Sequence, residues 1–465
     1  MRFSVPLLLT AIVLVAACDS GTTSVVDGPE STWDIIQTRI FQPKCTEACH
    51  SAGTSVAAQS GLLLTEDVAY QNLVGESPTN DAAAQEGLLR VHNTVSTDLH
   101  SSFLWEKINA PSQDHLFDEH PEFGAIMPLG ADPLTYGELS FIRRWILAGA
   151  PEEGVVADPI ILQDTAVFRA SSFEPLPMLA PDEGLSVRLG PFDVPAQFER
   201  EFFVREGAPV SETRLIRRST ISMTGGSHHF LLYSFDRNTP SSAIPLLGVT
   251  RELRQPNGNL VGATLRSMGY HIFFSGTQWP RMDYSFPPGV ALEMEAGTIL
   301  DLNPHFVNRT DEVRTGEVHV NLEYADPSSV DHVARVLNLN YTEFVLPPNR
   351  VTTIEKTYIM NERVHVFQLF SHAHEHMLDF QVRLSGGPRD GETIYLATDY
   401  EHPPILEVDP PLVLEAGQGF KLVTSYNNWT NDFLSFGFRS EDEMMILFGY
   451  YYSDSGNKVA PKMVD

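Results

Sequence analysis

Apolar residues are spaced differently in two parts of the chain. In residues 32–41 they recur at helical spacing after a Ser/Thr cap, and residues 136–149 also predict a helix. Beyond residue 160, short apolar runs rich in Val, Phe, Tyr and Leu recur between Gly and Pro clusters. Such runs occupy residues 202–204, 230–233, 318–324 and 421–424. The pattern predicts a helical module followed by all-β sandwich structure.

The length of 465 residues is too great for one ordinary core and suggests about three domains. A stretch rich in Pro and acidic residues at 151–159 predicts a linker. We place the helical module at residues 32–151 and two β domains at residues 160–335 and 336–460, with their junction near residues 331–346. No stretch beyond the N-terminal region approaches about 18 unbroken apolar residues, so no spanning helix is predicted.

Residues 1–17 are expected to be a secretory signal, because Arg2 precedes the apolar run 5–17. The sequence Val15-Ala-Ala-Cys18 resembles a bacterial lipobox, which implies that Cys18 is lipidated and that polar residues 18–31 form a flexible tether. The alternative is ordinary signal cleavage nearby, with Cys18 incidental. We therefore expect an exported protein, lipid-anchored to a bacterial membrane at the periplasmic face or the cell surface.

Composition narrows the class of partner. Hydrophobic residues make up 42% and aromatic residues 10% of the chain, as in globular proteins. The formal net charge of −29 disfavours nucleic acid and anionic membrane surfaces as partners, because both would repel the chain. A solvated acidic surface explains the same charge without any partner.

A His-x-His motif lies in residues 366–380, where apolar and polar residues alternate as in a β-strand. Residues i and i+2 of a strand share a face, so His372 and His374 would lie side by side and could coordinate one metal ion. Met444, in the later segment 440–452, is a candidate third ligand whose soft thioether favours copper, especially Cu(I). The alternative is an exposed histidine pair and a core methionine.

Two further histidine segments precede this motif. His228 and His229 are adjacent, and His305 lies in the segment 302–308. Neighbouring residues of a regular strand face opposite ways, so both members of the pair reach one metal only if the backbone twists or bulges. Gly225 and Gly226 permit such a bulge.

In this order, the segments resemble the type II copper, ascorbate-dependent monooxygenases, the group of peptidylglycine α-hydroxylating monooxygenase and dopamine β-monooxygenase. The resemblance covers roughly the last two-thirds of the chain, and residues 286–290 and 426–430 support it. It implies two tandem jelly-roll-like sandwiches with one copper each and a cleft between them. It assigns the electron-transfer copper to His228, His229 and His305, and the oxygen-binding copper to His372, His374 and Met444.

The peptide-amidating member of that group holds a substrate carboxylate with an Arg and a Tyr. Phe370 and Phe448 occupy these positions here, which disfavours a peptide C-terminus and favours a less charged or apolar substrate. Both phenylalanines are alternatively plain core residues.

The helical module contains Cys45-Thr-Glu-Ala-Cys49-His50, one residue longer than the c-type haem attachment signal Cys-x-x-Cys-His. Together with Met127-Pro128 and the helix 136–149, it resembles bacterial cytochrome c domains. The resemblance implies thioether bonds at Cys45 and Cys49, with His50 as proximal ligand and Met127 as distal ligand. The alternative is a Cys45–Cys49 disulfide in a domain without haem, and zinc is less favoured because four convergent ligands are not evident.

Taken together, the resemblances imply an oxidoreductase that hydroxylates a C–H bond of a small organic substrate with O2. Two copper ions are the implied cofactors. Electrons would come from ascorbate or another redox partner, or through a fused haem c that feeds the His228, His229 and His305 copper. One alternative is a non-catalytic copper and haem electron-transfer lipoprotein, and another is an enzyme whose first domain is only an interaction module.

Overall fold

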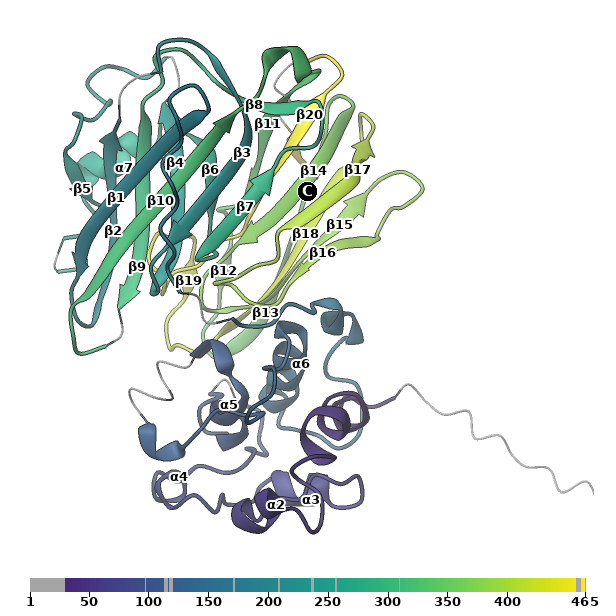
Figure 1. The fold of residues 1–465 in the computed structure, drawn as a ribbon. Coiled ribbons are helices and arrows are strands. Elements are labelled where there is room, and N and C mark those ends of the chain that lie inside the picture. The colour runs from purple at the N-terminus through teal and green to yellow at the C-terminus, as the bar shows by residue number, and fades with distance from the viewer. Residues whose placement is uncertain are drawn as a thin grey trace, which may run out of the picture.

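A computed structural model describes residues 30–464 of the chain, apart from 97, 113–115, 117–119, 170–171, 208–209, 236–237, 256, 309 and 457–460 (Figure 1). The expected signal peptide, Cys18 and nearly all of the expected tether lie outside the described residues. Among the helices that are described, none combines the length and the apolar character needed to cross a bilayer.

The chain begins with a helical part, as the sequence predicts. Ser31 caps the first helix in a capping box, in which its hydroxyl accepts from the Asp34 N–H at 3.1 Å. Thr135 caps the long helix α6 in the same way, using Glu138. The core contains Trp33 and Trp145, whose rings stack 5.2 Å apart. The helices are α1 (Thr32–Ile35), the π-helix η1 (Ile36–Thr46), α2 (Ser55–Ser60), α3 (Ala69–Leu73), α4 (Asp81–Gln85), α5 (Phe103–Ile108), the 3₁₀ turns η2 (Ala110–Ser112) and η4 (Pro121–Phe123), α6 (Tyr136–Leu147) and the 3₁₀ turn η5 (Pro159–Gln163).

The rest of the described chain is mostly β-structure in several sheets, which confirms the predicted β class in this general form. Its elements up to residue 329 are β1 (Gly184–Val194), β2 (Phe198–Glu206), β3 (Arg214–Met223), β4 (Ser227–Phe235), β5 (Thr250–Glu252), α7 (Gly262–Met268), β6 (His271–Thr277), β7 (Arg281–Ser285), β8 (Val290–Met294), β9 (Leu300–Asn308), β10 (Arg314–Tyr324) and η6 (Pro327–Ser329). The later strands are β11 (His332–Asn340), β12 (Val345–Leu346), β13 (Arg350–Ile359), β14 (Val364–His372), β15 (Met377–Ser385), β16 (Thr393–Ala397), β17 (Leu406–Leu414), β18 (Gly419–Asn428), β19 (Leu434–Ser435), β20 (Ile446–Ser453) and β21 (Lys462–Val464).

One sheet runs through both halves of the β-structure. Its nine strands follow the order β1-β10-β3-β8-β11-β20-β14-β17, with β7 paired to β3. The halves join where β8 and β11 pair in parallel, with Val290 opposite His332. Each half adds a five-stranded sheet, β5-β2-β9-β4-β6 in the first and β16-β15-β18-β13-β21 in the second. Apolar residues of the large sheet, such as Ile221, share one core with residues of the first small sheet, such as Phe230.

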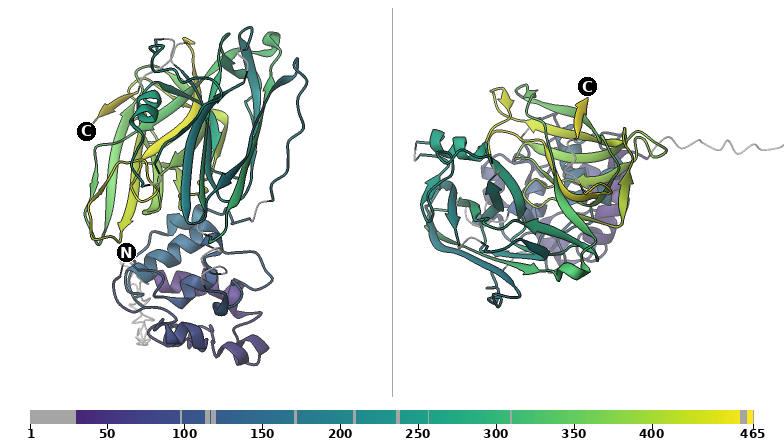
Figure 2. Two further views of the ribbon diagram at one scale, coloured as in Figure 1. Left: turned by 90° about the vertical axis from the view of Figure 1, so that its left-hand side faces the viewer. Right: turned by 90° about the horizontal axis from the view of Figure 1, so that it is seen from above.

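The helical part lies against one end of the sheets (Figures 1 and 2). Helix α6 makes the contact: the Arg143 guanidinium donates to the carbonyl oxygens of Leu378, at 2.6 Å, and Thr398, at 3.1 Å. Arg144 forms an ion pair with the buried Asp379. Both Leu378 and Asp379 belong to β15, so the helical module is fixed to the strand that follows the His-x-His motif.

Candidate metal centre

The first histidine group forms where β4 starts. The antiparallel register of β4 and β9 places His229 directly opposite His305. The register shifts between Ser227 and His229, and Gly226 has a φ of 80°, so the predicted backbone bulge is confirmed. The bulge turns His228 to the same side as the other two. Nitrogen atoms of the three imidazoles then lie within 4.8 Å of one another.

The second group is built differently from the prediction. A single strand over residues 366–380 is wrong: β14 ends at His372 and β15 begins at Met377, in another sheet. The physical reason is Glu443, a fully buried carboxylate that accepts the backbone N–H groups of His374, at 3.1 Å, and His376, at 2.7 Å. These bonds stabilise a turn in place of strand pairing. The rings of His372 and His374 still meet, 5.2 Å apart and edge to face.

Met444 lies beside this turn. The register of β14 and β20 ends with His372 opposite Ile446, and Met444 precedes β20 by two residues. The backbone N–H groups of His374 and Met444 both donate to the Glu443 Oε2 atom at 3.1 Å. The Met444 side chain is 8% exposed and packs in the main β core. The structure therefore places the three predicted residues of the second group at one corner of the fold.

The two groups form a single cluster, although the sequence predicts a cleft between them. The His228 ring lies 6.0 Å from the His372 ring and 6.2 Å from the His374 ring, between centroids. Nitrogen atoms of His228, His372 and His374 lie within 4.8 Å of one another, as those of the first group do. His228 thus belongs to both sets. Two tertiary features bring these residues together: the register of β4 against β9, and the turn between β14 and β15.

Three of the clustered imidazoles are oriented by hydrogen bonds on the side that faces away from the cluster. Such bonds fix the ring and leave the other nitrogen for a metal. The bonds run from His305 Nε2 to Glu199 Oε1 at 2.7 Å, from His372 Nδ1 to Gln278 Oε1 at 3.1 Å, and from His374 Nδ1 to the Asp442 carbonyl oxygen at 3.1 Å.

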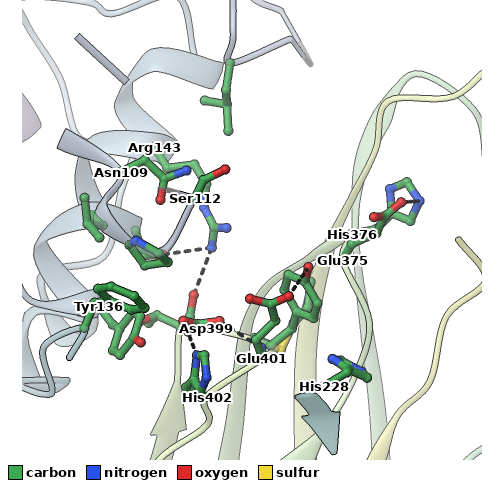
Figure 3. A pocket seen from close by; sticks show the side chains of 18 of the residues that line it. Asn109, Ser112, Tyr136, Arg143, His228, Glu375, His376, Asp399, Glu401 and His402 are labelled. Atoms are coloured by element: carbon green, nitrogen blue, oxygen red, sulfur yellow. Dashed lines mark hydrogen bonds and ion pairs between the residues drawn. The ribbon is translucent and has the colours of Figure 1, made fainter. Parts of the chain in front are cut away.

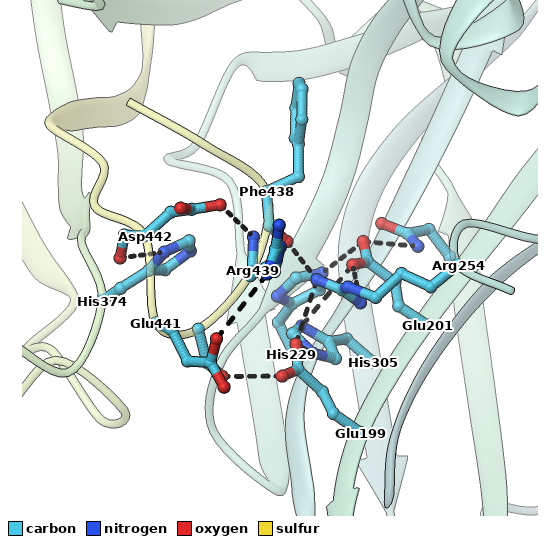
Figure 4. A network of polar contacts seen from close by, with 12 residues as sticks. Glu199, Glu201, His229, Arg254, His305, His374, Phe438, Arg439, Glu441 and Asp442 are labelled. Carbon is cyan, nitrogen blue, oxygen red and sulfur yellow. Dashed lines mark hydrogen bonds and ion pairs between the residues drawn. The ribbon is translucent and has the colours of Figure 1, made fainter. Parts of the chain in front are cut away.

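Two carboxylates lie behind the first group, those of the buried Glu201 and the partly buried Glu199 (Figure 4). Arg254 bridges Glu199, at 3.0 Å, and Glu201, at 3.3 Å, while Glu201 lies 3.7 Å from His229 Nε2. Burial opposes ionisation of Glu201, but His305, His229 and Arg254 outweigh it and lower its pKa to about 2. The pKa of Glu199 is likewise held below its ordinary range, against burial, chiefly by His305. A negative charge therefore faces the first group.

Several imidazole nitrogens in the cluster make no hydrogen bond to any described residue. They are His228 Nε2, His229 Nδ1, His229 Nε2 and His305 Nδ1, and all are buried. Burial, reinforced by the neighbouring histidines, lowers the pKa of His228 and His372 far below its ordinary value, and burial lowers that of His374 to about 4. The rings of His228, His372 and His374 are therefore neutral at pH 7, the form that binds a metal. Buried donors and acceptors are rarely left unpaired, so this donor set fits a transition-metal ion, and copper is among the metals that imidazole ligands suit.

Sequence reasoning missed the residues that orient the histidines. Glu199 and Glu201 alternate on β2, and Glu201 pairs in register with His305, so a Glu-x-Glu pattern on one strand face was the available signal. Gln278 follows β6 with no motif around it. Glu443 precedes Met444 in the Asp-Glu-Met run and could have been suspected there.

Phe370 and Phe448 are core residues. They face each other across β14 and β20, their rings stack 5.5 Å apart, and each is 8% exposed. Phe273 extends the stack, 5.0 Å from Phe448. The core interpretation of these two positions is the one that the burial supports.

Three of the four candidate haem residues, Cys45, Cys49 and His50, lie at or just after the end of η1. Cys45 and Cys49 are free thiols, and burial raises the pKa of Cys45 to about 12. His50 Nδ1 lies 3.1 Å from the Leu62 carbonyl oxygen, which leaves Nε2 as the nitrogen that can face an iron. Cys45 and Met127 pack against the same helical core. Two free thiols, an imidazole and a thioether fit haem c in their donor chemistry.

The geometry defines a buried cluster of imidazoles that could hold a metal ion, and comparison with known proteins does not assign the chain to a family. No family model matches the chain, and no curated protein matches it. Among solved structures, PNGase F is 12% identical over 61% of this chain and 100% of its own, with a TM-score of 0.29. A peptide-N(4)-(N-acetyl-β-D-glucosaminyl) asparagine amidase is 11% identical over 60% and 100%, with a TM-score of 0.27. The major capsid protein P2 of bacteriophage PM2 is 8% identical over 55% and 97%, with a TM-score of 0.22. At these TM-scores the likenesses support no conclusion about function.

Proposed function

We propose that this chain is an exported copper monooxygenase of the type II, ascorbate-dependent kind, which hydroxylates a C–H bond of a small organic substrate. The observation that carries the proposal is the cluster of five buried histidines next to the Met444 turn. Within it, His228, His229 and His305 have nitrogens that make no hydrogen bond to any described residue. The reaction balances as C–H plus O2, two electrons and two protons giving C–OH and water. Bound copper supplies oxygen activation and electron storage in that reaction.

The chain's own residues have separate tasks in this scheme. His228, His229 and His305 would hold the electron-transfer copper; Glu199 orients the His305 ring through a hydrogen bond, and Glu201 lies 3.7 Å from His229 Nε2. His372, His374 and Met444 hold the oxygen-binding copper, where a thioether favours the reduced ion. Glu443 keeps the turn that carries His374 against the strand that carries Met444. On this proposal each half of the β-structure is a jelly-roll-like sandwich, with the two halves sharing the nine-stranded sheet.

The helical part is proposed to be a cytochrome c module that delivers electrons in place of ascorbate or beside it. Cys45 and Cys49 would hold the haem, with His50 and Met127 as axial ligands. Replacing Cys49 by serine should lower covalent haem, measured by haem staining of a denaturing gel, and leave copper content unchanged. Wild-type protein that carries no covalent haem, when produced in a host that matures c-type cytochromes, would refute this part. Cys18 is proposed as the lipid anchor.

Elemental analysis tests the main proposal. Wild-type chain should carry two copper ions, and His374→Ala should lose the oxygen-binding one together with O2 consumption. His365→Ala is the matched control, because His365 lies on the same strand β14 but pairs with Asp454 at 2.8 Å. A wild-type chain without copper, or equal copper in both variants, would overturn the proposal.

A further inference from the structure

A cavity of about 700 Å³ lies between the helical part and the β-sheets (Figure 3). Tyr136 and Arg143 of α6 form part of one wall, and Gly225 and the β14–β15 turn form part of the other. Of the five clustered histidines, His228 lines this space. The cavity therefore reaches the candidate metal centre, and it has the size of small-molecule binding sites in proteins.

The charges that line the cavity are nearly balanced. Among the described lining residues, four carboxylates face three guanidinium groups, a formal sum of −1. They are Asp98, Glu375, Asp399 and Glu401, and Arg143, Arg169 and Arg314. Protein partners engage several of them: Arg169 pairs with Asp132 at 2.8 Å and Asp399 with His402 at 3.8 Å. A charged ligand would have to displace these partners or enter unpaired, which costs free energy.

Two buried polar atoms that line the cavity have neighbours but no hydrogen bond of ordinary length. Tyr136 Oη interacts with the Asp399 carboxylate, and His376 Nε2 lies 3.8 Å from Glu375 Oε1; the two residues are 3% and 1% exposed. The His376 ring also packs against Trp429, 3.9 Å away between centroids. Buried hydroxyl and imidazole groups are normally hydrogen-bonded, so these two are placed to meet a group on a ligand. Trp429 and Tyr136 add aromatic surface for an apolar body.

We propose that this cavity binds the organic substrate, and that the substrate is an uncharged molecule with an apolar or aromatic body and a hydrogen-bonding group. The helical part thereby contributes one wall of the substrate site through Tyr136. The inference rests on the proposed function for the reaction that follows binding, but the cavity itself can be tested without metal.

The test uses metal-free, full-length protein and two matched fluorescent probes. N-phenyl-1-naphthylamine is neutral and has an N–H donor, and 8-anilino-1-naphthalenesulfonate has the same rings and a negative charge. The neutral probe should saturate one site and bind at least about 10-fold more tightly than the sulfonate. Equal or tighter binding of the sulfonate, or no saturable binding of the neutral probe, would overturn the proposal.

Substitutions locate the site. Gly225→Trp should abolish neutral-probe binding, because an added Cβ at Gly225 meets no atom within 4 Å and the indole can occupy the cavity. Gly262→Trp is the matched control, since Gly262 is equally open but lies in α7, away from the cavity. Tyr136→Phe should weaken binding about 5-fold, because it removes a hydroxyl that lines the cavity and can bond the probe N–H. Unchanged binding in both cavity variants would contradict the assignment.

A copper titration separates this inference from the proposed function. Cu²⁺ bound beside His228 should quench the fluorescence of the cavity-bound neutral probe in wild-type protein. Failure of copper to bind overturns the proposed function, whereas copper that binds without quenching shows that the cavity does not reach the centre and overturns the inference.

Discussion

Replacing Glu443 by alanine should destabilise the fold strongly. The buried carboxylate accepts three backbone N–H groups, those of His374, His376 and Met444, at 2.7 to 3.1 Å. Each donor left unpaired in a buried site costs about 1–3 kcal/mol, so the three together cost about 3–9 kcal/mol. That is a large share of the roughly 5–15 kcal/mol by which native proteins are stable. We expect Glu443→Ala to unfold far earlier than wild type in denaturant, measured on metal-free protein.

The glutamine variant makes the test specific to hydrogen bonding. A Gln oxygen can still accept from His374 and Met444, which share one carboxylate oxygen, but its amide nitrogen faces the His376 N–H. Glu443→Gln should therefore lose one bond, about 1–3 kcal/mol. The control is Glu441→Ala in the same loop, whose side chain is 76% exposed. The reasoning is refuted if Glu443→Ala is within about 1 kcal/mol of Glu441→Ala, because surface changes have effects within about 0.5 kcal/mol.

The remaining predictions concern charge and docking. Glu199→Gln removes a negative charge that is hydrogen-bonded to His305 at 2.7 Å, and it should raise the reduction potential of a copper ion held there. A redox titration monitored by electron spin resonance measures that potential, and an unchanged value would contradict the prediction. Burial raises the pKa of Asp164 to about 6 in the folded state. Between about pH 4 and 6 the folded state therefore binds more protons than the unfolded state. As the pH rises through that window, the free energy of unfolding should fall by about 3 kcal/mol. Asp164→Asn keeps the acceptor for Thr398 and should abolish that fall in denaturant melts at pH 4 and 7, whereas an identical fall would refute it. Arg143→Ala should speed proteolysis between the helical part and the sheets, and a rate like wild type would mean that its two carbonyl contacts do not hold the domains together.

Local signals in the sequence predicted local features well. Helical spacing after a Ser/Thr cap predicted a helix at residues 32–41, where α1 and the π-helix η1 lie, because capping needs only residues three apart. The helix predicted at residues 136–149 is α6. The two glycines before His228 were expected to permit a backbone bulge there, and β4 has that bulge in its pairing with β9. The grouping of His228 and His229 with His305 came from the order of motifs and is matched by the β4–β9 register.

The sequence did not predict features that depend on contacts between residues far apart in the chain. The alternation around His372 is that of a strand, but Glu443, 71 residues later, ends the strand by binding the N–H groups of the turn. The contact between the two histidine groups depends on the pairing of sheets, which no local pattern encodes. Gln278 orients His372 from the end of another strand and carries no sequence signature of that role.

The parallel pairing of β8 and β11 has a mechanical consequence. Backbone bonds join β8 to β11, and the sheet continues through β20 to β14, whose last residue is His372. Separating the two halves would require breaking the backbone hydrogen bonds of this continuous sheet, whereas a flexible linker would only bend. The two halves of the β-structure are therefore expected to move as one rigid body. The helical part is attached to that frame by polar contacts from α6. Opening for a substrate is therefore expected to be a swing of the helical part, with the histidines fixed in place.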